Sequence, residues 1–329
     1  MGRLSFFGCA VLAAAVITPS AAAQVSATRT YYGAERPMPV EIVRPAGAEG
    51  DLTVRLLSAD NAELASAPTQ TGAADLAAMF ESLWVIDPAQ PTIRYAQLFA
   101  GGTPVGPALV LQPMTTPEQA YSFQSPGQRP EVRWRSGQRV VSGVRAYSEQ
   151  HVVMETTEGE IRFRMRPDAA PNTVWNFLTL ADGGYYTDVI FHRVVGGGNG
   201  RPPFVIQAGD PIGQGVGGPG FFVDLERSGL PHTFGVLSMA RSSDPNSAGS
   251  QVFICLSRAG TQGLDGSYTS FAEAVGGAAA ILAIESVETG ANDRPVSPPV
   301  IERTVLVPAP PRGTGPSVIA RPEAPDTGR

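Results

Sequence analysis

Short runs of β-branched and aliphatic residues recur between residues 38 and 114, and turn-forming residues separate them. Such runs at short spacing are typical of strands, whereas Asp60-Asn61 and Gly101-Gly102 are typical of tight turns. One short helical pattern falls near residues 75–80. The segment is therefore predicted to form a small β-sandwich-like module, with strands near residues 40–43, 52–56, 92–96 and 108–111.

Residues 151–308 carry a longer series of strand patterns together with two helix patterns. Apolar and charged residues alternate over residues 160–165, the period of a half-buried strand. A first helix is predicted from Pro171, which suits a first turn, to Gly183-Gly184, and a second over about residues 277–284. Many strands with two helices predict a mainly β domain, a closed antiparallel barrel with helices at its ends. Further strands are predicted near residues 152–157, 189–195, 204–207, 235–240, 252–256 and 300–307.

The first 23 residues have the pattern of a secretory signal peptide. Arg3 supplies the positive start, residues 4–17 are almost wholly apolar, and Ala21-Ala22-Ala23 offers small residues for cleavage before Gln24. The apolar run is too short to favour a permanent transmembrane helix. The pattern predicts export to a periplasm or beyond the cell with no membrane span after cleavage, and an uncleaved anchor is the alternative.

The remaining segments show little core pattern. Residues 24–37 are polar and are expected to be loose, and residues 115–150 read as a polar linker that contains three prolines. Residues 309–329 are rich in proline and glycine, and such a composition cannot bury enough apolar surface to offset the cost of ordering. They are predicted to be a disordered tail.

Charge and cysteine content narrow the range of functions. The 329 residues are 43% hydrophobic, with a formal net charge of −6, or −7 once Arg3 is removed with the signal. Because phosphate binding needs a basic face, nucleic acid is not the expected partner. Cys9 lies in the signal, so Cys255 is the one cysteine of the mature chain and cannot form an intramolecular disulfide. It is expected to be a buried small hydrophobic residue.

Three segments place an arginine, two glutamines and two phenylalanines on predicted strands. They are Phe191-His192-Arg193, the run from Phe204 to Gln207, and Gly249-Ser250-Gln251-Val252-Phe253-Ile254. This inventory lacks a nucleophile and a carboxylate pair. His151, His192 and His232 also lack the spacing of a metal site.

These segments, in this order, resemble the cyclophilins, a family of peptidyl-prolyl cis-trans isomerases. The likeness extends through residues 235–241, 246–254 and 264–268, and it covers roughly half of the mature chain. It implies an eight-stranded closed barrel capped by two helices, an isomerase that uses no cofactor, and proline-containing polypeptide segments as partners. A monomer is expected.

The chemistry of proline isomerisation explains why such residues suffice. Rotation about an X-Pro bond crosses a barrier of about 18–20 kcal/mol because amide resonance is lost, while its isomers differ by about 1 kcal/mol. No covalent step is required. A fixed guanidinium beside the prolyl nitrogen would stabilise the twisted amide more than the planar one. Arg193 is the candidate, since arginine stays charged and presents several donors, and the resemblance implies the same role.

The resemblance also implies the rest of the site. Gln207 would bind the peptide backbone and help to position Arg193. The other implied substrate-binding residues are Phe204, Val205, Phe253 and Leu264 around the proline ring, Gln251 along the preceding residues, the backbone of Ala240 and Arg241 beside an extended substrate, and Tyr268 in place of a frequent histidine.

Several positions depart from the family pattern. Gly263 stands where well-known members have a tryptophan, which puts tight cyclosporin binding in question more than isomerisation. Arg241 replaces an asparagine of the animal proteins. Residues 196–201 resemble a glycine-rich insertion, which is expected to be mobile and able to cover the groove.

Other interpretations of the same residues stay open. Arg193 alone could be a surface ion-pair residue, and Phe204 and Phe253 could be ordinary core aromatics. The run Gly213-Gln214-Gly215-Val216-Gly217-Gly218 matches a dinucleotide fingerprint by letters, but Pro219-Gly220 follows instead of a helix, so a loop is predicted.

Two alternatives to catalysis also follow from the sequence. The barrel could be a catalytically weak peptide-binding scaffold or chaperone. Residues 38–114 could be a targeting or adhesion module of the cell envelope.

Overall fold

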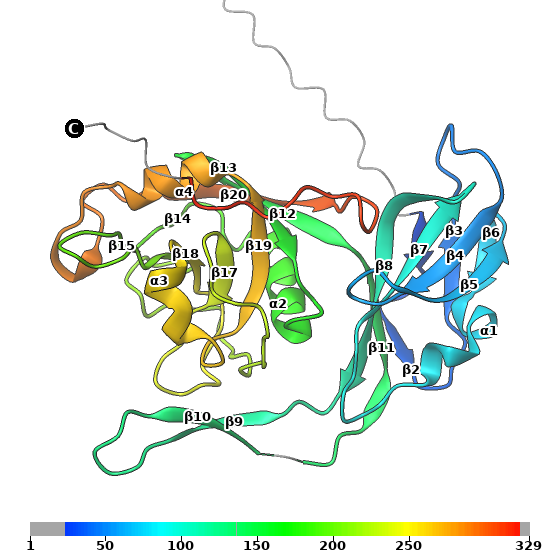
Figure 1. The fold of residues 1–329 in the computed structure, drawn as a ribbon, viewed down its shortest axis with the longest axis horizontal. Coiled ribbons are helices and arrows are strands. Elements are labelled where there is room, and N and C mark those ends of the chain that lie inside the picture. Colours follow the sequence, from blue (N-terminus) through cyan, green and yellow to red (C-terminus); the bar gives the residue numbers. More distant parts are fainter. Residues whose placement is uncertain (1–23, 136, 323–329) are drawn as a thin grey trace, which may run out of the picture.

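The computed structural model describes residues 24–135 and 137–322, so the predicted signal peptide lies outside the described residues. Figure 1 shows two β-rich bodies, an N-terminal module and a C-terminal domain. No helix in the described residues is both long and apolar enough to cross a membrane.

The N-terminal module contains two sheets that share one hydrophobic cluster. The smaller sheet has the order β1-β3-β6 and the larger the order β2-β11-β8-β7-β4-β5. Val40 and Ile42 of the smaller sheet and Leu56, Leu98 and Leu109 of the larger are all buried in this cluster. The elements are β1 (Val25–Ala27), β2 (Tyr31–Gly33), β3 (Pro39–Ile42), β4 (Leu52–Leu57), β5 (Glu63–Thr69), β6 (Gly72–Asp75), α1 (Leu76–Met79), η1 (Glu81–Trp84), β7 (Arg94–Ala100), β8 (Thr103–Thr115) and β11 (Val141–Ser148).

The module is larger than the sequence pattern indicates. Residues 24–37, expected to be loose, form β1 and β2, because Val25 and Tyr32 are buried in the shared cluster. Residues 115–150, expected to be a linker, contain β11, which pairs with β8 and β2. Val144 and Ala146 of β11 are two residues apart and both buried.

A two-stranded hairpin also comes from the segment expected to be a linker. It consists of β9 (Gln119–Phe123) and β10 (Glu131–Arg135), which pair antiparallel. We call it the arm. Figure 1 shows it running from the N-terminal module along one side of the C-terminal domain.

The C-terminal domain is built on one antiparallel sheet of nine strands, in the order β14-β20-β12-β13-β19-β17-β18-β16-β15. Its elements are β12 (Gln150–Thr156), β13 (Gly159–Met165), α2 (Pro171–Asp182), β14 (Val189–Ile190), β15 (Arg193–Val195), β16 (Val205–Ala208), β17 (Val236–Met239), β18 (Val252–Cys255), α3 (Arg258–Thr261), η2 (Gln262–Leu264), β19 (Ser270–Gly276), α4 (Ala278–Glu285), η3 (Ala291–Asp293) and β20 (Val300–Pro308).

The predicted closed barrel of eight strands is wrong. The sheet curls, but its ladder has two edges, β14 and β15, which are not paired with each other in the described residues. Only Phe191 and His192 separate these strands, and the Phe191 amide donates to the Pro299 carbonyl at 2.8 Å, which continues the β14–β20 pairing. One continuous strand pattern therefore divides between two sheet edges, and the covalent chain spans the gap.

Both predicted helices of this domain are present. In α2, Pro171 occupies the first turn, and Val174, Phe177, Leu178 and Ala181 are buried against the sheet. α4 follows Gly277, whose φ is 94°. A Cβ at that glycine would collide with the Glu160 carbonyl oxygen. These helices close the main core of the domain, as the apolar periodicity predicts.

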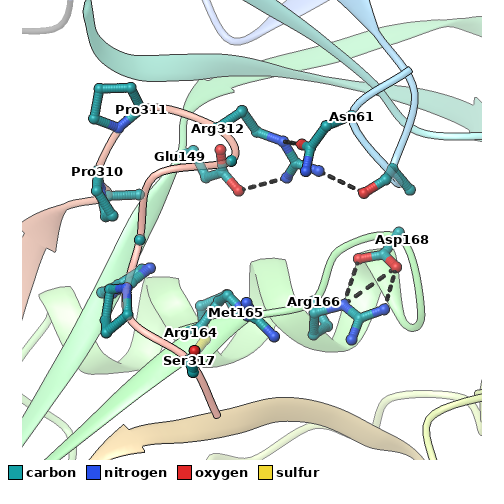
Figure 2. Close-up of a pocket in the computed structure, with 16 residues that line it drawn as sticks. Asn61, Glu149, Arg164, Met165, Arg166, Asp168, Pro310, Pro311, Arg312 and Ser317 are labelled. Carbon is teal, nitrogen blue, oxygen red and sulfur yellow. Dashed lines mark hydrogen bonds and ion pairs between the residues drawn. The ribbon is translucent and has the colours of Figure 1, made fainter. Parts of the chain in front are cut away.

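The tail from residue 309 to residue 322, predicted to be disordered, packs across both bodies. Figure 2 shows Arg312 reaching the N-terminal module, where Nε donates to Asn61 Oδ1 at 2.8 Å. Its Nη1 donates to Glu149 Oε1 at 2.8 Å, and its guanidinium carbon lies 3.6 Å from the centre of the Tyr95 ring. Farther along, the Ile319 amide donates to the Ala274 carbonyl at 3.0 Å. Composition does not reveal such specific partners.

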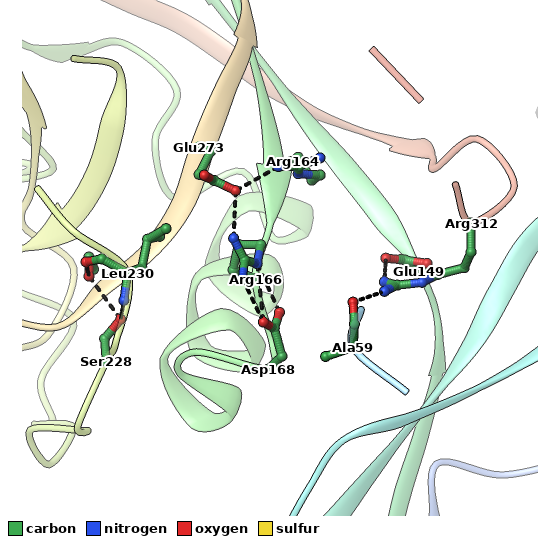
Figure 3. A network of polar contacts seen from close by, with 10 residues as sticks. Ala59, Glu149, Arg164, Arg166, Asp168, Ser228, Leu230, Glu273 and Arg312 are labelled. Atoms are coloured by element: carbon green, nitrogen blue, oxygen red, sulfur yellow. Dashed lines mark hydrogen bonds and ion pairs between the residues drawn. The ribbon is translucent and has the colours of Figure 1, made fainter. Parts of the chain in front are cut away.

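A polar cavity of about 370 Å³ lies under this tail. Across it from Arg312, Figure 3 shows Arg166 between Asp168 and Glu273, while Arg164 also contacts Glu273. Burial raises the pKa of Glu149, and the neighbouring Arg312 opposes that effect. The Arg312–Glu149 pair is thus a buried ionic connection between the tail and the start of the C-terminal domain.

We expect Arg312→Ala to lower the free energy of unfolding by about 3 kcal/mol, because it leaves the buried Glu149 carboxylate unpaired. The stability difference between wild type and variant should shrink on acidification, because protonated Glu149 has no charge that needs a partner. A carboxyl whose pKa is raised in the folded state makes the protein less stable as the pH rises. Urea unfolding at several pH values would measure both effects.

Arg303→Ala is the matched control. Arg303 also forms a two-contact pair with a glutamate, Glu155, but its side chain is 63% exposed. Exposed ion pairs contribute little, so its unfolding midpoint should stay near that of the wild type. Equal shifts in the two variants would contradict the assignment of Arg312 as a buried anchor.

Candidate active site

Strands at one end of the nine-stranded sheet place Arg193, Gln207 and Phe253 in one row. Arg193 of β15 lies opposite Gln207 of β16, and Gln207 lies opposite Phe253 of β18. The row continues to Ser238 of β17. Directly opposed residues of antiparallel strands project from the same face. The predicted cation, amide and aromatic side chains therefore share one face of the sheet.

Beside this row lies an apolar cluster separate from the main core. Val205 and Phe253 are buried in it, and its partly buried members form its exposed side. Six residues predicted to bind substrate belong to it, and we call them the Phe253 cluster: Phe204, Val205, Ala240, Phe253, Leu264 and Tyr268.

Phe253 is held between two rings. The His232 ring stacks on it with centroids 6.0 Å apart, and the Tyr268 ring meets it edge-on at 5.8 Å. His232 Nδ1 lies 2.9 Å from Asp265 Oδ1, and Nε2 lies 3.0 Å from Ser238 Oγ. The Phe253 ring is thereby held by His232, which is itself held by hydrogen bonds to Asp265 and Ser238.

The charges in that network are set by burial and hydrogen bonding. Burial lowers the pKa of His232, which favours a neutral ring. Burial alone would raise the pKa of Asp265, but hydrogen bonds from His232 and Arg258 outweigh it and lower that pKa. Sequence reasoning missed this support, because one histidine in a loop carries no spacing signal.

Arg193 is partly exposed, and its guanidinium faces a carboxylate of η3. Nε and Nη2 each lie 3.4 Å from Asp293 Oδ2, with the arginine side chain 39% and the aspartate 48% exposed. These contacts are long and open to water, so the ion pair restrains the guanidinium only weakly. Asp293 follows Arg193 by 100 residues, and no local pattern in the sequence predicts their contact.

The two predicted glutamines are linked to each other. The Gln207 amide donates to Gln251 Oε1 at 3.0 Å, and the Gln251 amide donates to the Gly217 carbonyl at 2.9 Å. Gln207 was expected to help position Arg193. It lies opposite Arg193 in the ladder, but its side-chain amide is directed to Gln251.

A second hollow of about 690 Å³ begins at these glutamines, and we call it the side cavity. One wall is the loop of residues 215–222, and the other includes Ala240, Arg241, Ser242 and Ser247. The buried Asp210 carboxylate fixes the start of the first wall, since it accepts the amides of residues 212, 214, 215 and 216. The glycine-rich run is a loop, as predicted, and no helix follows it.

The other predicted residues have defined partners. The Ala240 amide donates to the Gln251 carbonyl at 2.9 Å, so this N–H is already used within the protein. Arg241 donates to the Ser267 carbonyl at 2.9 and 3.1 Å and packs 4.5 Å from the centre of the Tyr268 ring. Arg241 therefore braces Tyr268.

Two of the positions that depart from the family pattern, Gly263 and the insertion of residues 196–201, were expected to affect the pocket walls. A Cβ added at Gly263 would meet no atom within 4 Å, so that side is open. The glycine-rich insertion forms a small turn in which Gly198 and Arg201 exchange backbone hydrogen bonds. Its residues do not line the side cavity.

Cys255 is fully buried, as predicted, and burial raises the pKa of its thiol. The exposed features beside the row are thus a guanidinium, amides and an apolar surface. Such a set can bind an extended peptide and stabilise a change in its electron distribution without forming a covalent bond.

Comparisons with known proteins point to the same chemistry. The family model described as "Cyclophilin type peptidyl-prolyl cis-trans isomerase/CLD" matches residues 151–306. Peptidyl-prolyl cis-trans isomerase-like 1 of Aspergillus fumigatus is 43% identical over 161 residues, which are 47% of this chain and 94% of that protein. Peptidyl-prolyl cis-trans isomerase ppi1 of Schizosaccharomyces pombe is 42% identical over 162 residues, 48% of this chain and 99% of that protein.

Among solved structures, a cyclophilin-type isomerase of Cryptosporidium parvum crystallised with the dipeptide Ala-Pro is 33% identical. The match covers 48% of this chain and 98% of that one, with a TM-score of 0.44. The family model and the extent of identity to the two fungal enzymes decide the assignment. This chain belongs to the cyclophilin-type peptidyl-prolyl cis-trans isomerases.

Proposed function

We propose that the chain is an exported isomerase that accelerates X-Pro rotation in polypeptides, with Arg193 as its catalytic residue. The observation that carries this proposal is the row in which Arg193, Gln207 and Phe253 occupy one face of three neighbouring strands. The row puts a partly exposed guanidinium at one end and the Phe253 cluster at the other.

The substrate's proline ring would lie against the Phe253 cluster. Phe253 is suited to this because His232 and Tyr268 fix its ring. The peptide backbone would follow the amides of Gln207 and Gln251, which bind chains without regard to side-chain identity. We call this surface, from the Phe253 cluster along Gln207 and Gln251, the substrate groove. Binding energy realised along it can be used to hold the amide in a twisted geometry.

Arg193 would act when the amide twists. Loss of resonance leaves a lone pair on the prolyl nitrogen, and an N–H of the guanidinium can donate to it. The planar ground state offers no such acceptor, so the contact lowers the barrier selectively. Weak pairing with Asp293 keeps the guanidinium near the groove while leaving it free to turn toward the substrate.

We expect Arg193→Ala to lower kcat/KM for a proline-containing test peptide by about 100-fold, because one donor to a developing charge is lost. The circular dichroism spectrum should match that of the wild type. Arg201→Ala is a suitable control, since Arg201 is an exposed arginine on the nearby insertion, and it should retain full activity. An unchanged rate in Arg193→Ala would remove this mechanism.

Export rests on the sequence of residues 1–23. When the full chain is produced in a bacterium with a Sec pathway, the mature protein should begin at Gln24, as N-terminal sequencing would reveal. Ala23→Arg should block cleavage, because the peptidase requires small residues there. Recovery of uncleaved wild-type protein in the membrane fraction would instead support the anchor alternative.

One feature favours a second function, the holding of unfolded chains. Ten large hydrophobic side chains are exposed in the described residues, and four of them lie between residues 212 and 222: Ile212, Val216, Phe221 and Phe222. Three of these also line the side cavity: Val216, Phe221 and Phe222. A clustered apolar patch beside a peptide groove is suited to apolar segments of the same substrate.

We expect Arg193→Ala to keep the ability to suppress aggregation of a diluted, unfolded client protein, measured by light scattering. The double variant Phe221→Ser/Phe222→Ser should lose the ability to suppress aggregation, but it should isomerise a short peptide at a normal rate. Val85→Ser and Val296→Ser are controls, since both valines are exposed elsewhere. If the phenylalanine variant suppresses aggregation as well as the controls do, the holding function is excluded.

A further inference from the structure

We propose that the arm of the N-terminal module is a positioning element for the substrate groove. In this view, which rests on the isomerase function proposed above, the arm holds one wall of the side cavity in place. The module would then set how tightly the domain binds peptides that extend beyond the proline. Ser122 and Trp134 of the arm are the positioning residues.

The wall in question is the turn of residues 242–247. Ser242 and Ser247 line the side cavity. The Ser242 amide donates to Ser247 Oγ at 2.9 Å, and the two hydroxyl oxygens lie 2.7 Å apart. Asp244 Oδ1 accepts the Asn246 amide at 2.9 Å. The turn thus presents a serine pair to the cavity and turns its other side outward.

The arm contacts that outer side directly. Ser122 Oγ of β9 donates to the Ser243 carbonyl at 3.0 Å. The Asn246 side-chain amide donates to the Ala120 carbonyl at 2.8 Å, and Ala120 is buried. Figure 1 shows β9 and β10 lying along the C-terminal domain, well away from the body of their own module.

A second contact secures the arm to the neighbouring loop. Arg227 Nε lies 2.9 Å from Glu118 Oε2, and its guanidinium carbon lies 4.5 Å from the centre of the Trp134 ring. Asn246 joins the two contacts, because its Oδ1 accepts the Leu225 amide at 3.2 Å. The arm, the wall and residues 225–227 therefore form one connected group.

The two faces of the arm differ in what they contact. Residues alternate across a strand, so Ala120, Ser122 and Trp134 lie on the face toward the C-terminal domain. Tyr121 and Arg135 lie on the opposite face, where the guanidinium is 5.1 Å from the ring centre. The arm thus offers both a test surface and a matched control.

The arm and the wall of the side cavity order each other. A two-stranded hairpin is marginally stable by itself, so the arm is ordered through its contact with the wall, and the wall is held from outside by the arm. Loosening the arm would let Ser242 and Ser247 move within the side cavity. Arg193, at the opposite end of the groove, would be unaffected.

The test uses the full chain. It compares the double variant Ser122→Ala/Trp134→Ala with the single variant Tyr121→Ala on the outer face of the arm. For a long peptide with four residues on each side of proline, the double variant should raise KM about tenfold, as expected when supporting contacts are lost. Its kcat should stay unchanged. A dipeptide-sized substrate that reaches only the proline pocket should show unchanged kcat and KM, and Tyr121→Ala should behave as wild type with both.

Equal KM values for the double variant and Tyr121→Ala would overturn the proposal, as would a fall in kcat for both substrates. A binding measurement keeps this result separate from the proposed mechanism. The fluorescence anisotropy of the labelled long peptide should report weaker binding when Ser122→Ala and Trp134→Ala are added to Arg193→Ala. That readout does not depend on turnover, so a wild type without isomerase activity would reject the function, and unchanged binding would reject the arm's role.

Discussion

Strand register is the constraint on which the site depends. Arg193, Gln207 and Phe253 lie far apart in sequence, and their common face exists only because β15, β16 and β18 pair without a shift of one residue. A slip by one position would turn every side chain of a strand to the other face. The buried Val194, Ile206 and Ile254, which alternate with the site residues, belong to the main core and fix that register.

The edge position of β15 follows from the same sheet. Because the ladder does not close, β15 pairs with β16 alone, and the other side of Arg193 meets η3 instead of another strand. A closed ladder would put a further row of side chains beside the guanidinium. Asp293 supplies a counter-charge from η3, and 39% of the arginine side chain stays exposed at this open edge.

Much of the domain could be predicted, because its signals are local. The apolar face of α2 and the alternation in β13 follow directly from sequence periodicity, and the ordered motifs identify the family. Other features depend on partners that no local pattern encodes. Val144 and Ala146 of β11 lie among polar residues, Arg312 finds its carboxylate 163 residues away, and His232 supports Phe253 from a loop. Tertiary contacts, and not propensity, decide those elements.

The two bodies meet at the tail, at the arm and where Trp175 of α2 packs against Tyr31 and Tyr147, and the first two contacts differ in kind. At the tail, the Arg312 side chain is 12% exposed and pairs with the buried Glu149, so breaking this contact leaves a buried charge unpaired. At the arm, the contacts are neutral hydrogen bonds, one exposed and one part-buried, and a cation–aromatic pair, and a neutral hydrogen bond contributes less than a buried charge pair. The first contact is therefore a fixed anchor and the second an adjustable one. An adjustable contact beside the side cavity is where an added module can influence peptide binding without altering the row that carries Arg193.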